Sequence, residues 1–381
     1  MSALTPVERI LLLAVTVASA LAGFANYERW AAVPRFVLAT AALAGLAWVI
    51  SFATEQLGER FGPGVTGLLQ STLGNLPEFF VVIFALQKGE LLVAQTALVG
   101  SILANALLVL GLVIVVGARR AQDGVMRFSK RLPRDTATLL QVTVFIIVLA
   151  GLSLGSHDRA SHHVNVISAV GAVSLLVVYG AWVVPYLRSD PLPERGRAAG
   201  ADGAVAGTAV ADASRRQRGV ARPGADEGPR LTLLLTLSLL AASGAASAFV
   251  SDWFVAALAP AIAKLGISRP FAGLVIVAIA GNAVENTAGL VLAWKGRSDL
   301  AISVVKNSVA QIAAFLFPLL VLVSFLLATT LTFALAPVYI GALALTALAV
   351  WQVTGDGEAA AFEGWALVAL YVILATLTLY E

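Results

Sequence analysis

The stretches Gly74-Asn75-Leu76-Pro77-Glu78 and Gly281-Asn282-Ala283-Val284-Glu285 each place a glutamate after a Gly-Asn pair inside an apolar segment, 207 positions apart. The same offset relates Ser101 to Ser308. A charged residue at the centre of a membrane helix costs about 2.5–3.5 kcal/mol on insertion scales, so it marks a candidate functional site. Duplicated, Gly-broken membrane helices are typical of secondary transporters with an ion site between their repeats. The pattern therefore predicts an internal duplication around an ion site.

The composition is that of a polytopic membrane protein, because 59% of residues are hydrophobic, 12% are charged and the mean hydropathy is +0.89. Charged residues make up about a quarter of a soluble protein. The chain has no cysteine, and its histidines, His157, His162 and His163, fall in one polar connection. Any cation site within the membrane must therefore use oxygen ligands, which suit Ca²⁺, Mg²⁺, Na⁺ or H⁺.

Apolar runs of about 20 residues predict an all-α fold of eleven membrane spans. The runs cover 9–25, 34–54, 62–86, 91–117, 137–155, 164–187, 231–251, 270–294, 299–327, 330–351 and 362–380. The duplicated segments occupy the third and fourth spans and the eighth and ninth. A shift of five spans is odd, so the second copy is expected to have inverted topology. The predicted parts are an extra N-terminal helix (1–30), a first five-helix repeat (31–187), a flexible linker (188–230) and a second five-helix repeat (231–381).

The distribution of basic residues predicts the orientation. Connections on the side of the N-terminus carry 18 Lys and Arg, those on the other side carry 6, and Lys306 lies within a span. Basic connections stay in the cytoplasm, so we expect a cytoplasmic N-terminus, an outside C-terminus and a prokaryotic plasma membrane. This bias also explains the basic isoelectric point, and we expect the lipid bilayer, and no nucleic acid, as a partner. The linker 188–230 reads as a tether, with a regulatory role left open.

The candidate cation ligands are the two glutamates and the polar residues that share their helix faces. Ca²⁺ takes six to eight oxygens, typically from carboxylates, amides, backbone carbonyls and water. The candidates are Glu78, Glu285, Asn75, Asn282, Ser101, Asn105, Ser308 and Gln311, with Asn307 beside them. For Ser101, Asn105 and Ser308 the alternative is a hydrogen bond between helices, worth about 0.6 kcal/mol each.

A pair of carboxylates could also exchange a cation for protons. Two nearby carboxylates in a cavity of low dielectric constant oppose each other's charge, and either a cation or protons relieve this repulsion. Occupancy by cation and by protons is then mutually exclusive, and the titration belongs to the pair. The residues thus predict a cation/proton antiporter that needs no cofactor.

The two repeat segments resemble the α-repeats of the Ca²⁺/cation antiporter superfamily, with Gly74 to Glu78 and QTALVGSILANALLVLG (95–111) in the first and GNAVEN (281–286) with SVAQIA (308–313) in the second. Eleven spans with an extra first helix resemble the cation/H⁺ exchanger branch. The resemblance implies that Glu78 and Glu285 bind the ion, and that the third, fourth, eighth and ninth spans form the core. It also implies that the second and seventh spans slide across that core, exporting Ca²⁺ in exchange for H⁺.

At three places the sequence departs from the pattern of that branch, and these departures leave other transported ions possible. Asn286 stands where a histidine often follows the second glutamate, the linker is basic instead of acidic, and Lys306 lies within the ninth span. Lys306 could compete with a divalent cation, join proton coupling, or face away and snorkel. The alternatives are Na⁺/Ca²⁺ or Na⁺/H⁺ exchange and, more remotely, a cation channel. An intramembrane enzyme is disfavoured because no Ser/Lys dyad, HExxH motif or paired Asp motif lies in the spans.

Overall fold

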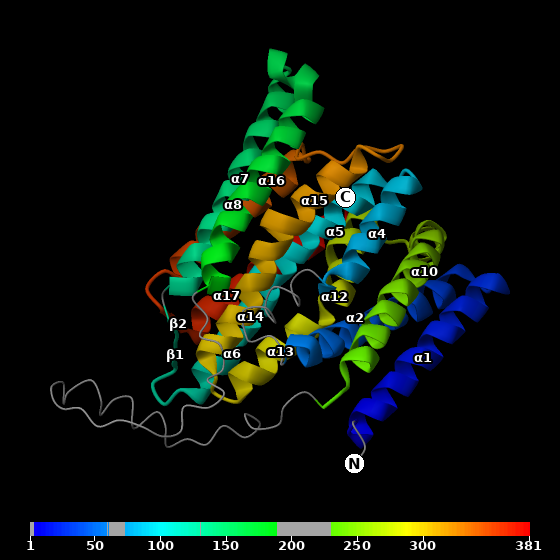
Figure 1. Ribbon diagram of the computed structural model, residues 1–381. Coiled ribbons are helices and arrows are strands. Elements are labelled where there is room, and N and C mark those ends of the chain that lie inside the picture. The colour runs from blue at the N-terminus through cyan, green and yellow to red at the C-terminus, as the bar shows by residue number, and fades with distance from the viewer. Residues whose placement is uncertain (1–3, 59, 61–72, 130, 189–229) are drawn as a thin grey trace, which may run out of the picture.

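The computed structural model describes residues 4–58, 60, 73–129, 131–188 and 230–381, with the backbone alone at 58, 131–134, 185–188, 284 and 285. Within these residues it is a helical bundle (Figure 1). Among the described residues nine helices are long and apolar enough to cross a membrane. Two consecutive segments, Arg269–Gly281 and Asn286–Trp294, are long and apolar enough only when taken together, and the chain bends by 57° between them. The predicted polytopic α-helical fold is confirmed. The count of eleven stays a prediction, because span 62–86 begins outside the described residues.

The elements before the linker run as follows: α1 (Pro6–Tyr27), α2 (Ala32–Gly58), α4 (Leu76–Gln87), α5 (Leu91–Leu103), the π-helix η1 (Ala104–Val109), α6 (Leu110–Arg120), β1 (Val125–Arg127), α7 (Arg131–Ser156), the 3₁₀-helix η2 (Arg159–His163) and α8 (Val164–Arg188). After the linker come α10 (Leu233–Leu265), α11 (Arg269–Phe271), the π-helix η3 (Ala272–Val277), α12 (Ala278–Gly281), α13 (Ala283–Trp294), α14 (Ser298–Gln311), the π-helix η4 (Ile312–Leu316), α15 (Phe317–Ser324), α16 (Pro337–Thr354), β2 (Glu358–Ala360) and α17 (Ala361–Leu379). Residues 189–229 of the predicted linker lie outside the described part of the chain.

Two predicted spans have different bounds in the structure. The span expected at 231–251 continues to Leu265, because Asp252 pairs with Lys88 at 2.6 Å at the bundle surface and so does not end the helix. The span expected at 330–351 begins only at Pro337. The apolar residues before it form extended chain that packs on the core, and the backbone N–H of Phe333 donates to the hydroxyl of Ser168 at 3.1 Å. Hydrophobicity there reflects burial and not a crossing.

The duplication is repeated in the backbone. Helices α4 and α13 both have 12 residues, and their first and last residues differ by 207. The glycines that follow them, Gly89 and Gly296, have left-handed φ values of 74° and 72°, which glycine adopts without steric cost. The π-helices η1 and η4 end at equivalent positions, Val109 and Leu316. The inverted topology and the division into five-helix halves stay predictions.

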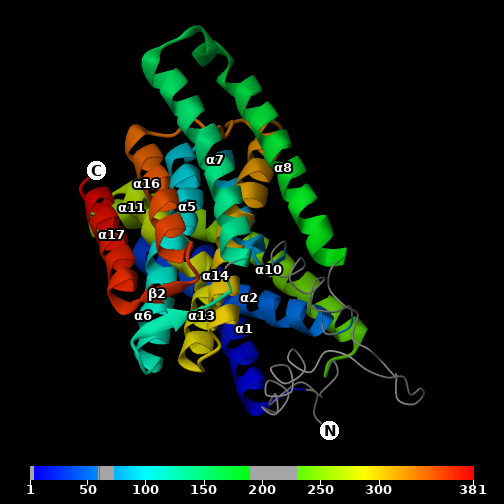
Figure 2. The ribbon, with the colours of Figure 1, turned by 90° about the vertical axis from the view of Figure 1, so that its left-hand side faces the viewer.

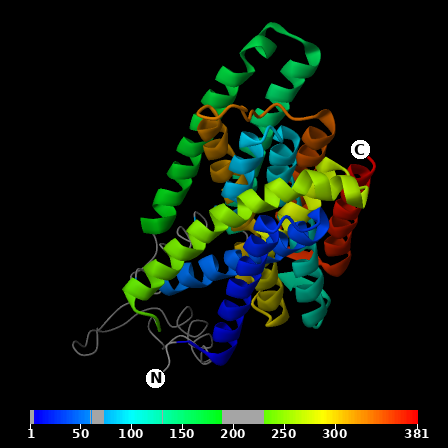
Figure 3. The same cartoon turned by 90° about the vertical axis from the view of Figure 1, so that its right-hand side faces the viewer.

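The helices of the repeat segments form the centre of the bundle. In the span Leu91–Arg120 (α5, η1 and α6) 83% of the 18-residue apolar window is buried, against 17% for α1. Helix α1 lies at the edge beside α2 and α10 (Figures 1 and 3), while α7 and α8 form a long hairpin (Figure 2). Glycine lets α5 cross η3 closely, since a Cβ on Gly100 would lie 2.4 Å from the carbonyl oxygen of Leu274.

Charged contacts join connections that the prediction places on the same side. On the side of the N-terminus, Arg230 pairs with Glu8 at 2.8 Å and the Ser129 backbone N–H donates to Asp299 at 2.6 Å. Strands β1 and β2 also pair there, antiparallel, with Met126 opposite Ala359. On the other side Lys88 pairs with Asp252 and Arg269 with Glu90. The small sheet was not predicted from the sequence.

Candidate cation site

Asn282 lies at the bend between α12 and α13, where the backbone leaves helical geometry at φ −104° and ψ 18°. Its side chain is fully buried. The Nδ2 group donates to the Ser101 hydroxyl at 2.9 Å and to the Ala278 carbonyl at 2.9 Å, and Oδ1 accepts from Asn105 Nδ2 at 3.0 Å. The broken helix of the second copy therefore bonds directly to the helix of the first.

Asn105 extends these bonds, because its Nδ2 also donates to the Ser308 hydroxyl at 3.2 Å. We call Ser101, Asn105, Asn282 and Ser308 the amide cluster. Each side chain is at most 4% exposed. Two members come from the first copy and two from the second, and all four belong to the residues that the sequence singled out.

The π-helices lie beside this cluster. Helix η1 contains Asn105, and η4 begins directly after Gln311. Such wide turns disturb the regular i to i−4 bonds and are frequent at functional sites. In η4 the Ala313 carbonyl accepts a hydrogen bond from the Thr143 hydroxyl of α7 at 3.3 Å. The local widening positions polar groups and leaves backbone oxygens open to other partners.

Glu78 lies in the first turn of α4, with its side chain 2% exposed. It lines a small cavity of about 10 Å³ together with Leu43 of α2, Phe254 of α10 and Gly281 of α12. A Cβ added to Gly281 would lie 3.8 Å from the Glu78 Cβ. The glutamate of the first copy therefore lies against the Gly-Asn bend of the second. The positive end of the α4 dipole favours a carboxylate in this first turn.

The two remaining duplicated residues are described in different detail. Asn75 is 5% exposed and caps α4 at the position equivalent to Asn282 in α13. Glu285 is the third residue of α13, as Glu78 is of α4, but its side chain lies outside the described residues. The pairing of the two carboxylates in one site therefore stays a prediction.

Several buried oxygens near the bend could accept a cation. The Oδ1 atoms of Asn105, Asn286 and Asn307 are buried without a hydrogen-bond donor among the described residues. Gln311 is 9% exposed, at the end of α14. The described residues form no group of three or more His, Cys, Asp or Glu side chains. A cation bound here would take amide, hydroxyl and backbone oxygens beside the carboxylates, which fits a hard ion.

The sequence analysis missed the polar face of α10. Ser247 and Ser251 are fully buried, and the Ser251 hydroxyl donates to the Pro77 carbonyl at 3.4 Å, one residue from Glu78. The Ser247 hydroxyl has no hydrogen-bond partner within the described structure. The four-residue spacing of Ser243, Ser247 and Ser251 is the signal that could have identified this face.

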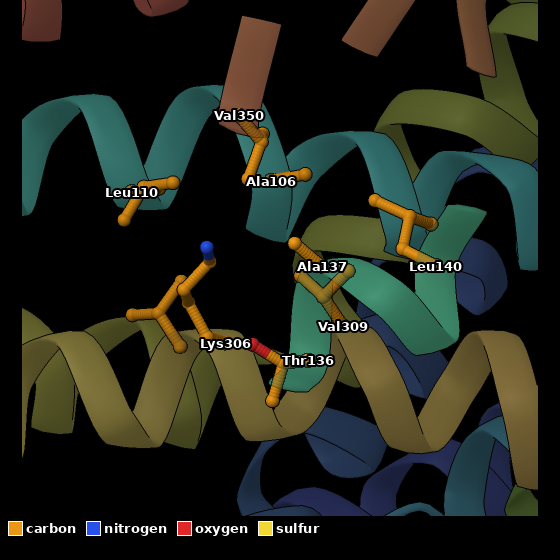
Figure 4. Close-up of a pocket in the computed structure, with 9 residues that line it drawn as sticks. Ala106, Leu110, Thr136, Ala137, Leu140, Lys306, Val309 and Val350 are labelled. Carbon is orange, nitrogen blue, oxygen red and sulfur yellow. The ribbon is translucent and has the colours of Figure 1, made fainter. Parts of the chain in front are cut away.

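Lys306 does not join the amide cluster. Its side chain is 3% exposed, and its Nζ donates to the Thr354 hydroxyl of α16 at 2.6 Å. The amine borders a cavity of about 10 Å³ and points from α14 toward the helix that carries Ala106 and Leu110, near Val350 (Figure 4). It therefore neither snorkels to the surface nor bonds to Ser308.

Comparison with known proteins identifies relatives over most of the chain. The vacuolar calcium ion transporter of Schizosaccharomyces pombe is 29% identical over 354 residues, covering 92% of this chain and 80% of the relative. A Ca²⁺/H⁺ antiporter of Synechocystis sp. is 29% identical over 362 residues, covering 92% of each.

Solved structures share the fold. Native YfkE superposes with a TM-score of 0.76 at 24% identity, covering 97% of this chain and all of that one. The H⁺/Ca²⁺ exchanger CAX gives a TM-score of 0.69 at 14% identity, covering 98% and 93%. The family model described as sodium/calcium exchanger protein matches residues 31–186 and 235–380, the two segments on either side of the linker. The chain belongs to the sodium/calcium exchanger protein family.

Proposed function

We propose that this transporter exports Ca²⁺ in exchange for H⁺ by alternating access. The observation that carries the proposal is the position of Glu78 against Gly281, next to an amide cluster drawn from both copies. A site built between two repeats keeps its ligands when the repeats change the side to which it opens. The relatives named as Ca²⁺/H⁺ antiporters agree with this choice of ions.

The cation is proposed to bind between Glu78 and Glu285, with Asn75, Asn282 and the other members of the amide cluster completing its oxygen shell. Gln311 and Asn307 are proposed to lie at the edge of the site. Amide and hydroxyl groups turn toward a cation at little cost when their present bonds are worth about 0.6 kcal/mol each. Ca²⁺ tolerates such mixed, irregular shells better than Mg²⁺, which requires near-octahedral geometry.

Proton coupling is proposed to come from the same two carboxylates. With the cation bound they are ionised, and after its release they take up protons. An unneutralised pair is costly to move through a core of low dielectric constant. The empty, ionised form therefore does not change the side to which the site opens. Each change of side carries either the cation or protons, so that one is exchanged for the other.

The N-terminus is proposed to lie in the cytoplasm of a prokaryotic cell, since basic residues favour that side by 18 to 6. Paired charges such as Arg230 with Glu8 then lie on the cytoplasmic face, and Lys88 with Asp252 on the outer face. Reporter fusions at the two ends of the chain would test this orientation.

Exchange that involves Na⁺ is the second candidate. Asn286 offers a neutral buried oxygen directly after Glu285. Lys306 adds a buried amine on α14, on the side that faces Ala106 and Leu110. Both features favour an ion of lower charge.

Flux in proteoliposomes separates these functions. An imposed pH gradient should drive Ca²⁺ uptake, and Glu78→Gln and Glu285→Gln should each abolish it. Glu363→Gln is the matched control, because Glu363 lies outside the proposed site and accepts a hydrogen bond from the Ala360 N–H at the start of α17, at 2.7 Å, which a glutamine oxygen can also accept. Uptake that persists in both site variants would remove the proposed site. Movement of Na⁺ alone would select the second candidate, and current without any coupled gradient would indicate a channel.

A further inference from the structure

The π-helices η1, η3 and η4 each release a backbone carbonyl from its α-helical bond. In an α-helix the N–H of each residue bonds to the carbonyl four residues before it. At the end of η3 the Ala278 N–H bonds instead to the carbonyls of Gly273 and Val275. The Leu274 carbonyl, which an α-helix would pair with Ala278, is therefore left for another donor. A carbonyl without a donor is costly in the core of a membrane protein.

The two copies release equivalent carbonyls in η1 and η4. At the end of η1 the Leu110 N–H bonds five residues back, to Asn105, and so passes over the Ala106 carbonyl. At the end of η4 the Phe317 N–H likewise bonds five residues back and passes over the Ala313 carbonyl. Ala106 and Ala313 are 207 positions apart. These wide turns are therefore part of the duplication.

Hydroxyl groups of two outer helices bond to the carbonyls released in η3 and η4. The Tyr371 hydroxyl of α17, at the edge of the bundle (Figure 2), donates to the Leu274 carbonyl at 3.4 Å. The Thr143 hydroxyl of α7 lies 3.3 Å from the Ala313 carbonyl and 3.0 Å from the Leu139 carbonyl of its own helix, and shares its proton between them. Tyr371 is 3% exposed and Thr143 is fully buried, so neither bond is open to bulk water.

A wide turn sets the orientation of one flank of its helix against the other. One extra residue in a turn rotates the rest of the helix by about 100° and shifts it by about 1.5 Å. Only α12 separates η3 from the bend at Asn282, and Gln311 directly precedes η4. Closing either turn to α-helical geometry would therefore displace an amide of the candidate cation site.

We propose that Tyr371 and Thr143 are positioning residues that keep η3 and η4 wide and so hold Asn282 and Gln311 in the geometry that binds the cation. This inference rests on the proposed function, because it assumes a cation site at these amides. Neither hydroxyl touches the ion. Each stabilises the wide turn over an α-helical turn, because the carbonyl that it binds already has a backbone donor in the α-helical form.

The size of the effect follows from the strength of one such bond. A side-chain hydrogen bond between membrane helices shifts an equilibrium by about threefold. Without the hydroxyl the empty site relaxes, and the ion must restore the wide turn when it binds. Loss of one hydroxyl should therefore weaken Ca²⁺ binding about threefold, and loss of both about tenfold, because the two hydroxyls act on separate turns.

The test measures equilibrium binding of Ca²⁺ to the purified full-length protein at pH 8, where protons compete weakly. Tyr371→Phe and Thr143→Val remove a hydroxyl and keep the shape of the side chain, so each should raise the Kd about threefold. Thr143→Ser keeps the hydroxyl and should retain the wild-type Kd. Tyr339→Phe is the matched control for the phenol, because the buried Tyr339 hydroxyl donates to the Glu381 carboxylate at 2.6 Å, and its Kd should not change.

Hydrogen exchange separates positioning from a purely structural role. In Tyr371→Phe, amide exchange in 273–282 should rise without Ca²⁺ and return to the wild-type level when Ca²⁺ saturates the protein. A purely structural role would lower the unfolding free energy and leave the Kd unchanged. An unchanged Kd in both hydroxyl-free variants, or an equal rise in Thr143→Ser and Thr143→Val, would overturn the proposal. Because the two residues lie on different helices, failure of one variant to fold leaves the other as a test.

The outcome also distinguishes this inference from the proposed function. Weakened Ca²⁺ binding in the hydroxyl-free variants without pH-driven Ca²⁺ flux in the wild type would support positioning and reject Ca²⁺/H⁺ exchange. Flux in the wild type with unchanged Kd values in the variants would do the reverse. Failure of the wild-type protein to bind Ca²⁺ would reject both.

Discussion

Replacing Asn282 with leucine should separate the structural and the transport roles of the amide cluster. Asn282 makes hydrogen bonds of 2.9, 2.9 and 3.0 Å to Ser101, Ala278 and Asn105. Side-chain hydrogen bonds between membrane helices are worth about 0.6 kcal/mol on average, so the loss of the two bonds to Ser101 and Asn105 should cost about 1 kcal/mol of unfolding free energy. The cost stays below that of three unpaired groups in a soluble core, about 1–3 kcal/mol each, because the unfolded chain in a membrane also finds partners.

A double-mutant cycle with Ser101→Ala assigns part of that cost to one bond. The coupling free energy between Asn282 and Ser101 should be about 0.6 kcal/mol, measured by SDS-induced equilibrium unfolding in mixed micelles. Ser174→Ala is the matched control, because the Ser174 hydroxyl donates to the Val170 carbonyl of its own helix at 2.8 Å and, within the described part of the chain, to no other helix. Combined with Asn282→Leu it should give no coupling.

The transport assay then decides what the cluster is for. If the cluster supplies ion ligands, Asn282→Leu should abolish flux although most of the unfolding free energy remains. Normal flux with the expected loss of stability would mean that the cluster only joins helices. A coupling energy indistinguishable from the Ser174 control would refute the hydrogen-bond geometry itself.

Three further outcomes are expected. Gly100→Ala places a methyl group 2.4 Å from the Leu274 carbonyl, so it should lower unfolding free energy by about 1–3 kcal/mol in the same micelles, whereas an unchanged value would mean that the helices separate freely. Because the chain has no cysteine, Lys88→Cys with Asp252→Cys provides a single pair of thiols at the ends of an ion pair between the α4–α5 connection and α10. Joining them with a bifunctional thiol reagent should stop transport if α10 slides, and continued flux in the cross-linked protein would argue against sliding. The hydrogen bond from the Ser153 hydroxyl lowers the pKa of Asp158 below its ordinary value of 3.8. Folding therefore favours the ionised carboxylate, and amide hydrogen exchange in 156–163 should rise as the pH falls through the lowered pKa. Asp158→Asn has no carboxylate to protonate, so its exchange should show no such rise in the same pH range.

Much of the fold could be predicted because the decisive signals are local. Apolar length identifies spans, and the Gly-Asn pairs identify the bends, since the bounds of α4 and α13 follow the offset of 207 residue for residue. The segment 330–336 misled because apolar residues are needed both to cross a bilayer and to cover a protein core. Its backbone groups bond to Ser324 and Ser168, partners that no local pattern reveals.

The members of the amide cluster could be predicted, but their partners could not. Residue type and repeated position selected Asn282, while the crossing of α5 and η3 decides that it meets Ser101 and Asn105. That crossing depends on contacts between helices far apart in sequence. For the same reason the sequence did not identify the buried serine face of α10 and did not determine the direction in which the Lys306 side chain points.

The bounds of α4 and α13 follow the duplication residue for residue, whereas several buried polar residues do not, and this difference bears on mechanism. Asn105, the residue that joins both copies, has Ile312 at its equivalent position, and Lys306 has Val99. An inverted repeat with identical side chains would give the outward and inward forms equal energies. With the predicted inverted repeats, the two forms of this chain would present different sets of amides to the ion. The two forms should therefore differ in cation affinity, and a lower affinity on the releasing side is what an exporter requires.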